Sequence, residues 1–528
     1  MLGQAFATRR GVFSRAYQYS MLGVVLAAQA LLGGCVQQAS RTHLAPKGDE
    51  GAVLLKISEN RQTMGWAAIH GDAIAVRRVA DAADASPECF MLKTSIRGLS
   101  ASTFMGASLP PGTYEFPTVG AGDFTVGECN ARVLLGGRDT RFGKFVIEPH
   151  RLTYLGTWER TGNSEVGKSL MIPMKETNPT GLKEVLTEVF PDLGTFADDA
   201  PLGWVDGTLP PDLDQVNRYA LQFSYGLLDP SQEADGTWIF GSRTGVVRSW
   251  KPGGSSATDH DTGRRVVLQT TAVLADGSWL VGGEQSTLLR SSDRGKTWQS
   301  VRGNLPYGLI TKLAVKQQDI LLTLVDKDDV AVFRASMPSM QWTKVASYKK
   351  EFARWTGVPG ATVQSFLAGD KYVTTLPSKQ LAVYDIRTGV SESHDLPGGI
   401  QYFSVDRDQV LRCRCIAVLA VNPYQSSDFG RTWTSATYDR YFMMPAMRDA
   451  KNGAVWTQKE FAYTRDGGAT WTKATQTSAK LPHVFYSNDG KSVYATDDIN
   501  SIWSSTDDGL NWNPSLLITL PAGDRLAQ

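Results

Sequence analysis

The sequence has almost no net charge and few residues of the types that ligate metals. Its 54 basic residues balance 53 acidic ones, which leaves a formal charge of +1, and no run of basic residues occurs. Because binding to nucleic acid through bulk electrostatics needs a basic surface, this class is excluded and no nucleic-acid partner is expected. The five Cys and six His have no spacing that suggests a zinc site. We therefore expect neither a metal nor a cofactor.

Trp and Gly, in contrast, are plentiful, with 14 Trp and 51 Gly in 528 residues. The hydrophobic content of 42% and the charged content of 20% are ordinary for a soluble globular protein. A chain of this length is long for a single core and indicates two or three domains.

The first 35 residues have the pattern of an export signal rather than of a folded domain. A positive segment without acidic residues precedes an apolar stretch at 21–32, which is too short to span a bilayer as a stable helix. The basic residues are Arg9, Arg10 and Arg15. The stretch ends in Leu-Gly-Gly-Cys at 32–35, which resembles a bacterial lipobox. This resemblance implies that Cys35 is lipidated and becomes the new N-terminus; the alternative is an ordinary signal peptide with a chance Cys.

Lipidation at Cys35 makes a membrane the first expected partner, because more than one acyl chain gives stable anchoring. Val36 follows the cysteine, so the Asp that signals retention in an inner membrane is missing. In a host with two membranes we therefore expect an outer-membrane lipoprotein that faces the periplasm or the cell surface.

The other four cysteines agree with export to an oxidising compartment. Cys89 and Cys129 fall in one predicted domain and could form a disulfide. Cys413 and Cys415 lie in a strand-like run, where residues i and i+2 face the same side but are nearly too far apart for an unstrained bridge. We favour buried thiols at these two positions over a strained disulfide.

Short strands with turn signals predict a small antiparallel β-sandwich at 51–175, after a polar tether at 36–50. The Pro-Pro-Gly segment within 109–116 predicts a turn into a strand, since Pro sets the bend and Gly accepts a positive φ. The runs at 144–149 and 151–155 predict a hairpin.

A linker with one helix is expected at 176–214. Thr180 can cap this helix and Pro191 stops it. Its apolar residues keep the i, i+3, i+4, i+7 spacing of a helix face. They are Leu182, Val185, Leu186 and Val189.

An eight-residue motif, Ser/Thr-x-Asp-x-Gly-x-Thr/Asn-Trp, occurs four times after residue 215. Its four fixed positions are Ser291, Asp293, Gly295 and Trp298; Ser426, Asp428, Gly430 and Trp433; Thr464, Asp466, Gly468 and Trp471; and Ser505, Asp507, Gly509 and Trp512. The motif resembles the Asp-box of sialidases, sortilin-like proteins and the photosystem II assembly factor family. That resemblance implies a β-propeller.

Degenerate copies of the repeat fill the rest of 215–528. The repeat ends lie near residues 250, 298, 342, 392, 433, 471 and 512. The spacing between ends suits four short strands and their turns, which is one propeller blade. We therefore predict an all-β protein with a seven-bladed propeller, with six or eight blades as the margin of error.

The Asp-box is expected to be structural. Its Ser and Asp oxygens can accept hydrogen bonds from the backbone of their own turn, and Gly permits a left-handed residue. The Trp is expected to wedge between sheets, so that Trp298→Ala or Trp471→Ala costs about 3–5 kcal/mol. Calcium binding or catalysis by the Asp is the disfavoured alternative, because the resembled families carry these boxes on the blade periphery.

Propellers place function at the axial mouth, on loops between strands. The candidate mouth residues are the charged residues in turns that precede the third strands: Arg243, Glu284, Lys327, Asp329, Lys379, Lys459 and Asp498. We favour a binding or assembly module for an envelope protein or glycan, without catalytic residues, as the resemblance to the photosystem II assembly factor family implies.

The alternative function is a glycoside hydrolase. It would need two of Glu284, Asp329 and Asp498 to lie about 5–9.5 Å apart. The Arg-Ile-Pro signature of Asp-box sialidases is absent, and the chain has room for one propeller where xyloglucanase-like enzymes use two. Both observations disfavour the hydrolase.

Overall fold

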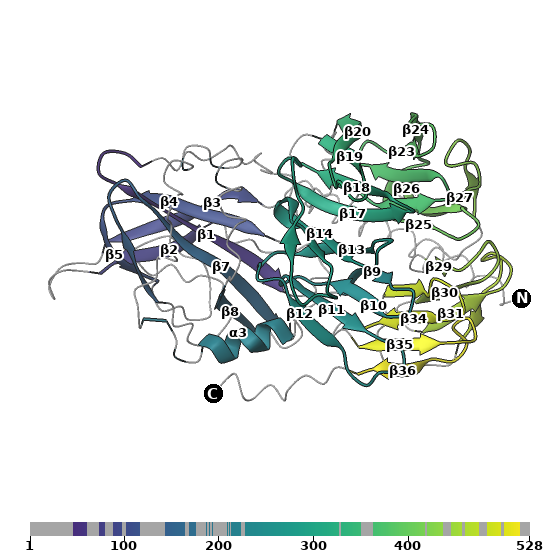
Figure 1. The fold of residues 1–528 in the computed structure, drawn as a ribbon, viewed down its shortest axis with the longest axis horizontal. Helices are drawn as coiled ribbons and strands as arrows, with labels where there is room; N and C mark the ends of the chain where they lie inside the picture. The colour runs from purple at the N-terminus through teal and green to yellow at the C-terminus, as the bar shows by residue number, and fades with distance from the viewer. Residues whose placement is uncertain are drawn as a thin grey trace, which may run out of the picture. The chain divides into compact units, whose positions relative to one another are not determined.

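Figure 1 shows the computed structural model of the protein, in which one larger sheet is followed along the chain by seven four-stranded sheets. The structure describes residues 46–60, 73–79, 88–97, 102–116, 143–163, 168–175, 186, 190, 193, 208–209, 211, 213–222, 227–326, 329–349, 363–417, 420–436, 445–456, 460–474, 483–497 and 501–517. Cys35, Cys129, Lys327, Lys459 and Asp498 lie outside the described residues. The lipid anchor and the disulfide between Cys89 and Cys129 therefore stay predictions.

The first eight strands form one sheet in the order β6-β5-β2-β3-β4-β1-β7-β8. They are β1 (Gly51–Asn60), β2 (Ala73–Arg78), β3 (Cys89–Arg97), β4 (Thr103–Leu109), β5 (Gly112–Glu115), β6 (Lys144–Ile147), β7 (Leu152–Asn163) and β8 (Lys168–Met174). Neighbouring strands are antiparallel except β1 and β7, which run parallel. This sheet is called the N-terminal sheet below.

The N-terminal sheet curls around its own core. Val53 of β1, Phe145 of the edge strand β6 and Trp158 of β7 belong to one buried apolar cluster. β6 lies at one edge of the sheet and β7 lies next to the other, so the two strands share a core only if the sheet curls. The prediction of a small all-β domain is thus confirmed. The domain differs from the predicted antiparallel sandwich because it is a single curled sheet that contains one parallel pair of strands.

The two turns predicted in this region have different outcomes. The Pro-Pro-Gly turn is confirmed: Gly112 has a φ of 154°, and the Tyr114 hydroxyl donates to the Pro110 carbonyl at 2.8 Å. The hairpin predicted across 149–150 is wrong, because β6 pairs with β5 while β7 pairs with β1 and β8. The turn there, with His150 at a φ of 55°, carries the chain from the edge strand β6 to β7, which lies next to the opposite edge of the sheet.

The described helix, α3 (Leu213–Gln222), spans the boundary that we expected between linker and propeller. Its Asn217 ties it to the sheet, since the side-chain amide donates to Pro173 O at 2.9 Å and accepts from Lys175 N at 2.8 Å. Of the helix predicted at 182–189, Leu186 is helical and fully buried, and its other residues lie outside the described ones.

Seven antiparallel sheets follow, each built from four strands that are consecutive in the sequence. Blade 1 contains β9 (Leu228–Gln232), β10 (Trp238–Gly241), β11 (Val246–Trp250) and β12 (Thr258–Asp261); blade 2 contains β13 (Leu268–Val273), β14 (Trp279–Gly283), β15 (Leu288–Ser291) and β16 (Gln299–Ser300). Blade 3 contains β17 (Leu309–Lys316), β18 (Asp319–Val325), β19 (Asp329–Ser336) and β20 (Thr343–Lys349); blade 4 contains β21 (Ser365–Ala368), β22 (Lys371–Leu376), β23 (Gln380–Asp385) and β24 (Ser391–Asp395).

The last three blades complete the ring. Blade 5 contains β25 (Gly399–Val405), β26 (Leu411–Ala417), β27 (Ala420–Ser426) and β28 (Thr434–Ser435); blade 6 contains β29 (Ala446–Met447), β30 (Gly453–Trp456), β31 (Phe461–Thr464) and β32 (Thr472–Lys473); blade 7 contains β33 (His483–Tyr486), β34 (Val493–Thr496), β35 (Ile502–Ser505) and β36 (Asn513–Leu516). The prediction of seven blades is confirmed.

The ring closes by packing between blades 1 and 7 and not by strand exchange. Aromatic rings of blade 7 meet Trp238 of blade 1, with centroids 5.0 Å from Phe485 and 5.5 Å from Tyr494. Beside them, Asn488 N donates to Gln232 Oε1 at 2.8 Å. In Figure 1 the teal strands of blade 1 accordingly lie beside the yellow strands of blade 7.

The four Asp-boxes adopt one hydrogen-bonded geometry. In each, the Ser or Thr hydroxyl accepts from the box Gly N at 2.7–2.9 Å, and the Asp carboxylate accepts from the Thr or Asn N at 2.9 Å. The four box glycines have φ values between 83° and 95°. These bonds lie within each box's own turn, which is the geometry expected of a structural motif.

The box indoles are buried to different extents. Trp512 is 8% exposed and stacks on Phe461 of blade 6 with centroids 4.1 Å apart. Trp298, Trp433 and Trp471 are half-buried. Trp298, Trp433 and Trp512 belong to apolar clusters within or between blades. Because Trp298 and Trp471 are only half-buried, the expected cost of Trp298→Ala and Trp471→Ala falls below the range predicted from full burial.

Candidate functional site

The strand connections define two faces of the propeller. The turns between first and second strands, together with the Asp-boxes between third and fourth strands, lie on what we call the lower face. The turns between second and third strands, and the connections from one blade to the next, lie on the upper face. This alternation follows from the antiparallel order of the four strands in every blade.

Hydrogen bonds connect different blades on the lower face. Arg407, in the first turn of blade 5, donates to Ser487 O of blade 7 at 2.7 Å and also to Asn488 O. Because blade 6 lies between these blades, the Arg407 side chain passes on the axial side of blade 6. The neighbouring Asp408 accepts from Ala450 N of blade 6 at 2.8 Å. These bonds connect the lower-face turns of blades 5, 6 and 7.

The inner strands of blades 1 to 3 carry a polar hub near the upper face. Asp229 of β9 accepts from Lys312 Nζ of β17 at 2.6 Å and from the Thr270 hydroxyl of β13. Asp229 also has a φ of 30°, which is uncommon for a residue other than Gly. The half-buried carboxylate of Asp229 thus joins three blades, because each of its oxygens accepts a hydrogen bond from another blade. The sequence carried no signal for it except an Asp before Pro230.

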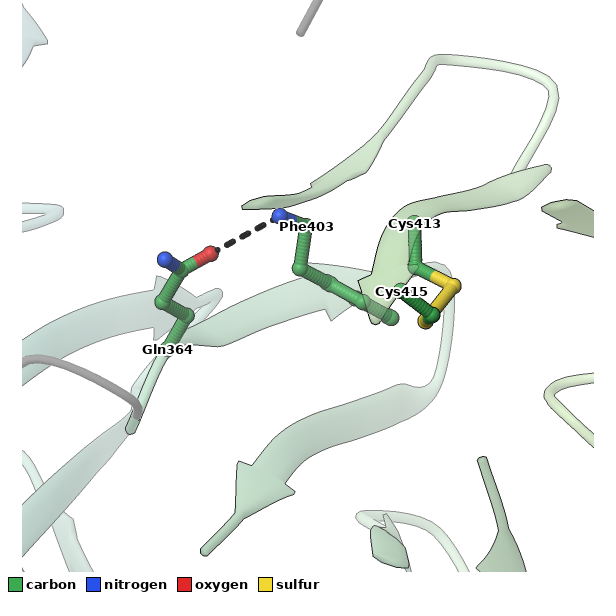
Figure 2. Close-up of a disulfide and its surroundings, with 4 residues drawn as sticks. All are labelled: Gln364, Phe403, Cys413 and Cys415. Carbon is green, nitrogen blue, oxygen red and sulfur yellow. Dashed lines mark hydrogen bonds between the residues drawn. A yellow bond between two sulfur atoms is a disulfide. The ribbon is translucent and has the colours of Figure 1, made fainter. Parts of the chain in front are cut away.

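The inner wall is joined in a similar way between blades 4 and 5. Gln364 precedes β21, and its side-chain carbonyl accepts from Phe403 N of β25 at 3.1 Å, as Figure 2 shows. Phe403 pairs with Cys413 of the next strand, where Cys413 and Cys415 form a disulfide. Both cysteines are fully buried in the apolar cluster shared by these blades.

The disulfide corrects our preference for thiols at Cys413 and Cys415. Their Cα atoms are 5.7 Å apart, within the roughly 4.4–6.8 Å that a disulfide accepts. The facing strand β25 has an irregular register between Ile400 and Tyr402, opposite Cys415. Such a bulge increases the local twist of the strand pair that contains the two cysteines.

The described candidate mouth residues all lie at upper ends of blades, but in different surroundings. Lys379, in the turn between β22 and β23, is exposed and has a φ of 62°. Asp329 begins β19 and pairs with Lys349 Nζ at 2.8 Å, which lowers the pKa of its carboxyl. Arg243 is half-buried in the turn between β10 and β11.

Glu284 is covered by the N-terminal sheet. It lies in the short 3-10 turn η3 (Glu284–Ser286) and is 4% exposed. Its carboxylate accepts from Ser102 N at 3.2 Å and from the Ser102 hydroxyl at 2.7 Å, and from Val267 N of its own propeller at 3.1 Å. The sheet and the propeller belong to one compact unit, and this carboxylate connects them.

Of the three carboxylates considered for hydrolysis, Glu284 is bonded to the sheet and Asp329 to Lys349, and Asp498 lies outside the described residues. In the described part of the chain, no group of three or more His, Cys, Asp or Glu side chains could hold a metal ion. No described helix is long and apolar enough to span a membrane.

Comparisons with known proteins find likeness in structure only. No protein-family model matches the chain, and no curated protein matches its sequence. Among solved structures, it is similar to YCF48 bound to a D1 peptide, with 13% identity and a TM-score of 0.42 over 53% of this chain and 92% of that one. It is also similar to virginiamycin B lyase from Staphylococcus aureus (10% identity, TM-score 0.41, 53% and 95% covered) and to BamB from Moraxella catarrhalis (12% identity, TM-score 0.35, 52% and 80% covered).

Proposed function

We propose that the chain is a lipid-anchored protein of the cell envelope whose propeller binds a protein partner on its upper face, as a binding or assembly module. The observation that carries this proposal is the exposure of Lys379 and Ile416 at the upper ends of blades 4 and 5. On the lower face, hydrogen bonds of Arg407 and Asp408 connect the turns of blades 5, 6 and 7.

The upper ends of blades 4 and 5 are the favoured contact surface. Lys379 is exposed at the tip of blade 4, and Ile416 of β26 is 44% exposed at the same end of blade 5. An exposed aliphatic side chain and an exposed charged one on neighbouring blades suit the apolar centre and polar rim of a protein interface. The N-terminal sheet bonds to the upper end of blade 2, which is a different sector of the ring.

Location in the envelope is supported by two independent observations. The sequence has a lipobox-like segment that ends at Cys35. The propeller contains a buried disulfide between Cys413 and Cys415, and such bonds form and persist in oxidising compartments. Metabolic labelling with a palmitate analogue tests the anchor: the wild type should take up label and sediment with membranes, and Cys35→Ala should do neither. Equal labelling of the two proteins would contradict lipidation at Cys35.

Site-specific photo-cross-linking tests the binding face. A photoreactive amino acid at Lys379 should give protein adducts in envelope preparations, identified by mass spectrometry. The matched control is Lys296, an equally exposed lysine in an Asp-box of the lower face, which should give none. Adducts from Lys296 alone, or adducts to glycans in place of proteins, would contradict the proposal.

A further inference from the structure

The contact between the N-terminal sheet and the propeller contains a buried cluster of ionisable groups. We call it the junction cluster, and it consists of Lys56, Ser58 and Glu159 from the sheet and Arg243 and Glu284 from the propeller. Lys56, Ser58, Glu159 and Glu284 are each at most 4% exposed. A polar cluster buried at such a contact is costly unless its members satisfy one another.

The polar members near Glu284 are satisfied across the contact. Glu284 accepts from both Ser102 N and the Ser102 hydroxyl, and Lys56 Nζ donates to the carbonyl of Arg265 in the connection between blades 1 and 2. The described apolar contribution of the propeller is one residue, Tyr307, packed against the sheet's second apolar cluster. Among the described residues, hydrogen bonds and charged groups therefore join the sheet to the propeller together with this apolar contact.

Glu159 is the acidic member that is not satisfied, and the Ser58 hydroxyl also lacks a hydrogen-bond partner among the described residues. It faces Ser58 in the parallel register of β1 and β7 and is fully buried. Neither of its carboxylate oxygens has a hydrogen-bond partner of acceptable geometry among the described residues, although the Ser58 hydroxyl lies near.

The charged groups that face Glu159 come from both sides of the contact: Lys56 of β1, Arg243 of the β10–β11 turn and Glu284 of η3. Burial raises the pKa of Glu159 to about 8, and Glu284 adds to this, while Lys56, the Ser58 hydroxyl and Arg243 oppose it. A carboxyl in this position is most stable with its proton bound.

We propose that the N-terminal sheet is a proton-controlled cover on the upper face, docked on blades 1 and 2 while Glu159 is protonated and released when Glu159 ionises. Release exposes both carboxylates of the junction to water and uncovers the upper ends of these blades. The docking step itself does not depend on the proposed partner; only its effect on partner binding rests on the proposed function.

The direction of the pH effect follows from proton linkage. The docked state holds the proton of Glu159 up to about pH 8, whereas an exposed glutamate loses it near pH 4.5. Docking is therefore strongest below the lower of these values. Its equilibrium constant falls by up to about tenfold per pH unit between them, and changes no further above the higher one.

Hydrogen exchange of the full chain measures docking directly. The reporter is the Ser102 amide, which donates to Glu284 only when the sheet is docked. Its protection factor, corrected for the intrinsic rate at each pH, should fall at least tenfold from pH 6 to pH 8. The amide of Cys413, within blade 5, should keep its protection and thereby exclude global unfolding.

Two variants separate the proposal from a general pH effect. Glu159→Gln keeps the shape of the side chain without its titration, so Ser102 should stay protected at both pH values. Glu88→Gln, which removes an exposed carboxyl of the same sheet, should keep the wild-type pH dependence. The proposal is overturned if wild-type protection is equal at pH 6 and pH 8, or if Glu159→Gln retains the wild-type fall. Since no partner enters this experiment, its outcome is separate from that of the cross-linking at Lys379.

Discussion

At the scale of single residues, the Asp-box glycines serve two purposes. Their positive φ is one, and the sequence could predict it from the motif. The other is close approach to the preceding blade: a Cβ on Gly430 would lie 2.6 Å from Leu381 Cδ2, and one on Gly295 would lie 2.6 Å from the His260 ring. The second purpose depends on how neighbouring blades pack, which no local pattern reports.

Gly430→Ala separates these two contributions when it is compared with Gly236→Ala. The two glycines have φ values of 87° and 89°, but nothing lies within 4 Å of a Cβ on Gly236. We expect Gly236→Ala to lower the free energy of unfolding by about 1–2 kcal/mol, for the backbone alone. Gly430→Ala should lose about 1–3 kcal/mol more because of the contact with Leu381. Equal losses in denaturant unfolding would contradict the close approach.

The box aspartates make stability sensitive to acid. Hydrogen bonds from the side chain and backbone of Thr297 hold the pKa of Asp293 at about 2, and Thr432 and Thr470 act in the same way on Asp428 and Asp466. Because these values lie below that of an unfolded aspartate, about 3.9, the stabilisation is complete above pH 4 and disappears as the pH falls through 2.

Acid unfolding of a variant with asparagine at all three positions tests this directly. In the wild type, the free energy of unfolding should fall between pH 4 and pH 2. The triple variant should be less stable at pH 6 and should have a flatter profile across that interval, because it has lost the three carboxyls that titrate. A profile as steep as that of the wild type would show that other groups dominate the acid response.

At the scale of elements, the disulfide between Cys413 and Cys415 in β26 can be tested on the wild-type protein. The chain is denatured without reductant, alkylated and digested, and the peptide that contains Cys413 and Cys415 is weighed. We expect no alkylation at either position before reduction and two alkyl groups after it. Alkylation of both positions without reductant would contradict the disulfide and support the free thiols that the sequence analysis favoured.

The sequence predicted an element correctly when the interactions that form it join residues close together in the chain. The Asp-boxes are closed by bonds within eight residues, so the motif was sufficient to predict their turns and, by repetition, the blades. The parallel pairing of β1 with β7 joins segments about a hundred residues apart, and turn signals alone suggested a hairpin in its place. Helix α3 was missed because only half of its ten residues are apolar and because its anchor, Asn217, bonds to a distant strand.

At the scale of the whole molecule, the candidate residues of the upper face also show that sequence patterns predict local turns but not contacts between distant segments. Blade alignment correctly placed Arg243, Glu284 and Lys379 in turns before third strands. It could not indicate that Ser102 of another domain bonds to Glu284, because nothing in the repeat encodes where the N-terminal sheet docks. The polar hub of Asp229 and Lys312 was missed for a related reason: it joins blades 1 and 3 across the inner wall.

Every functional statement about an upper face depends on the ring being closed, since an open array of sheets has no axial mouth. Cross-linking with a short bis-maleimide tests closure most directly. In Gln232→Cys with Asn488→Cys, the two positions bond across the seam between blades 1 and 7, so the folded chain should form the link in high yield. The control is Gln232→Cys with Asp370→Cys in blade 4, across the ring, which should form none. A missing link in the first pair, or equal links in both, would contradict a closed seven-bladed ring.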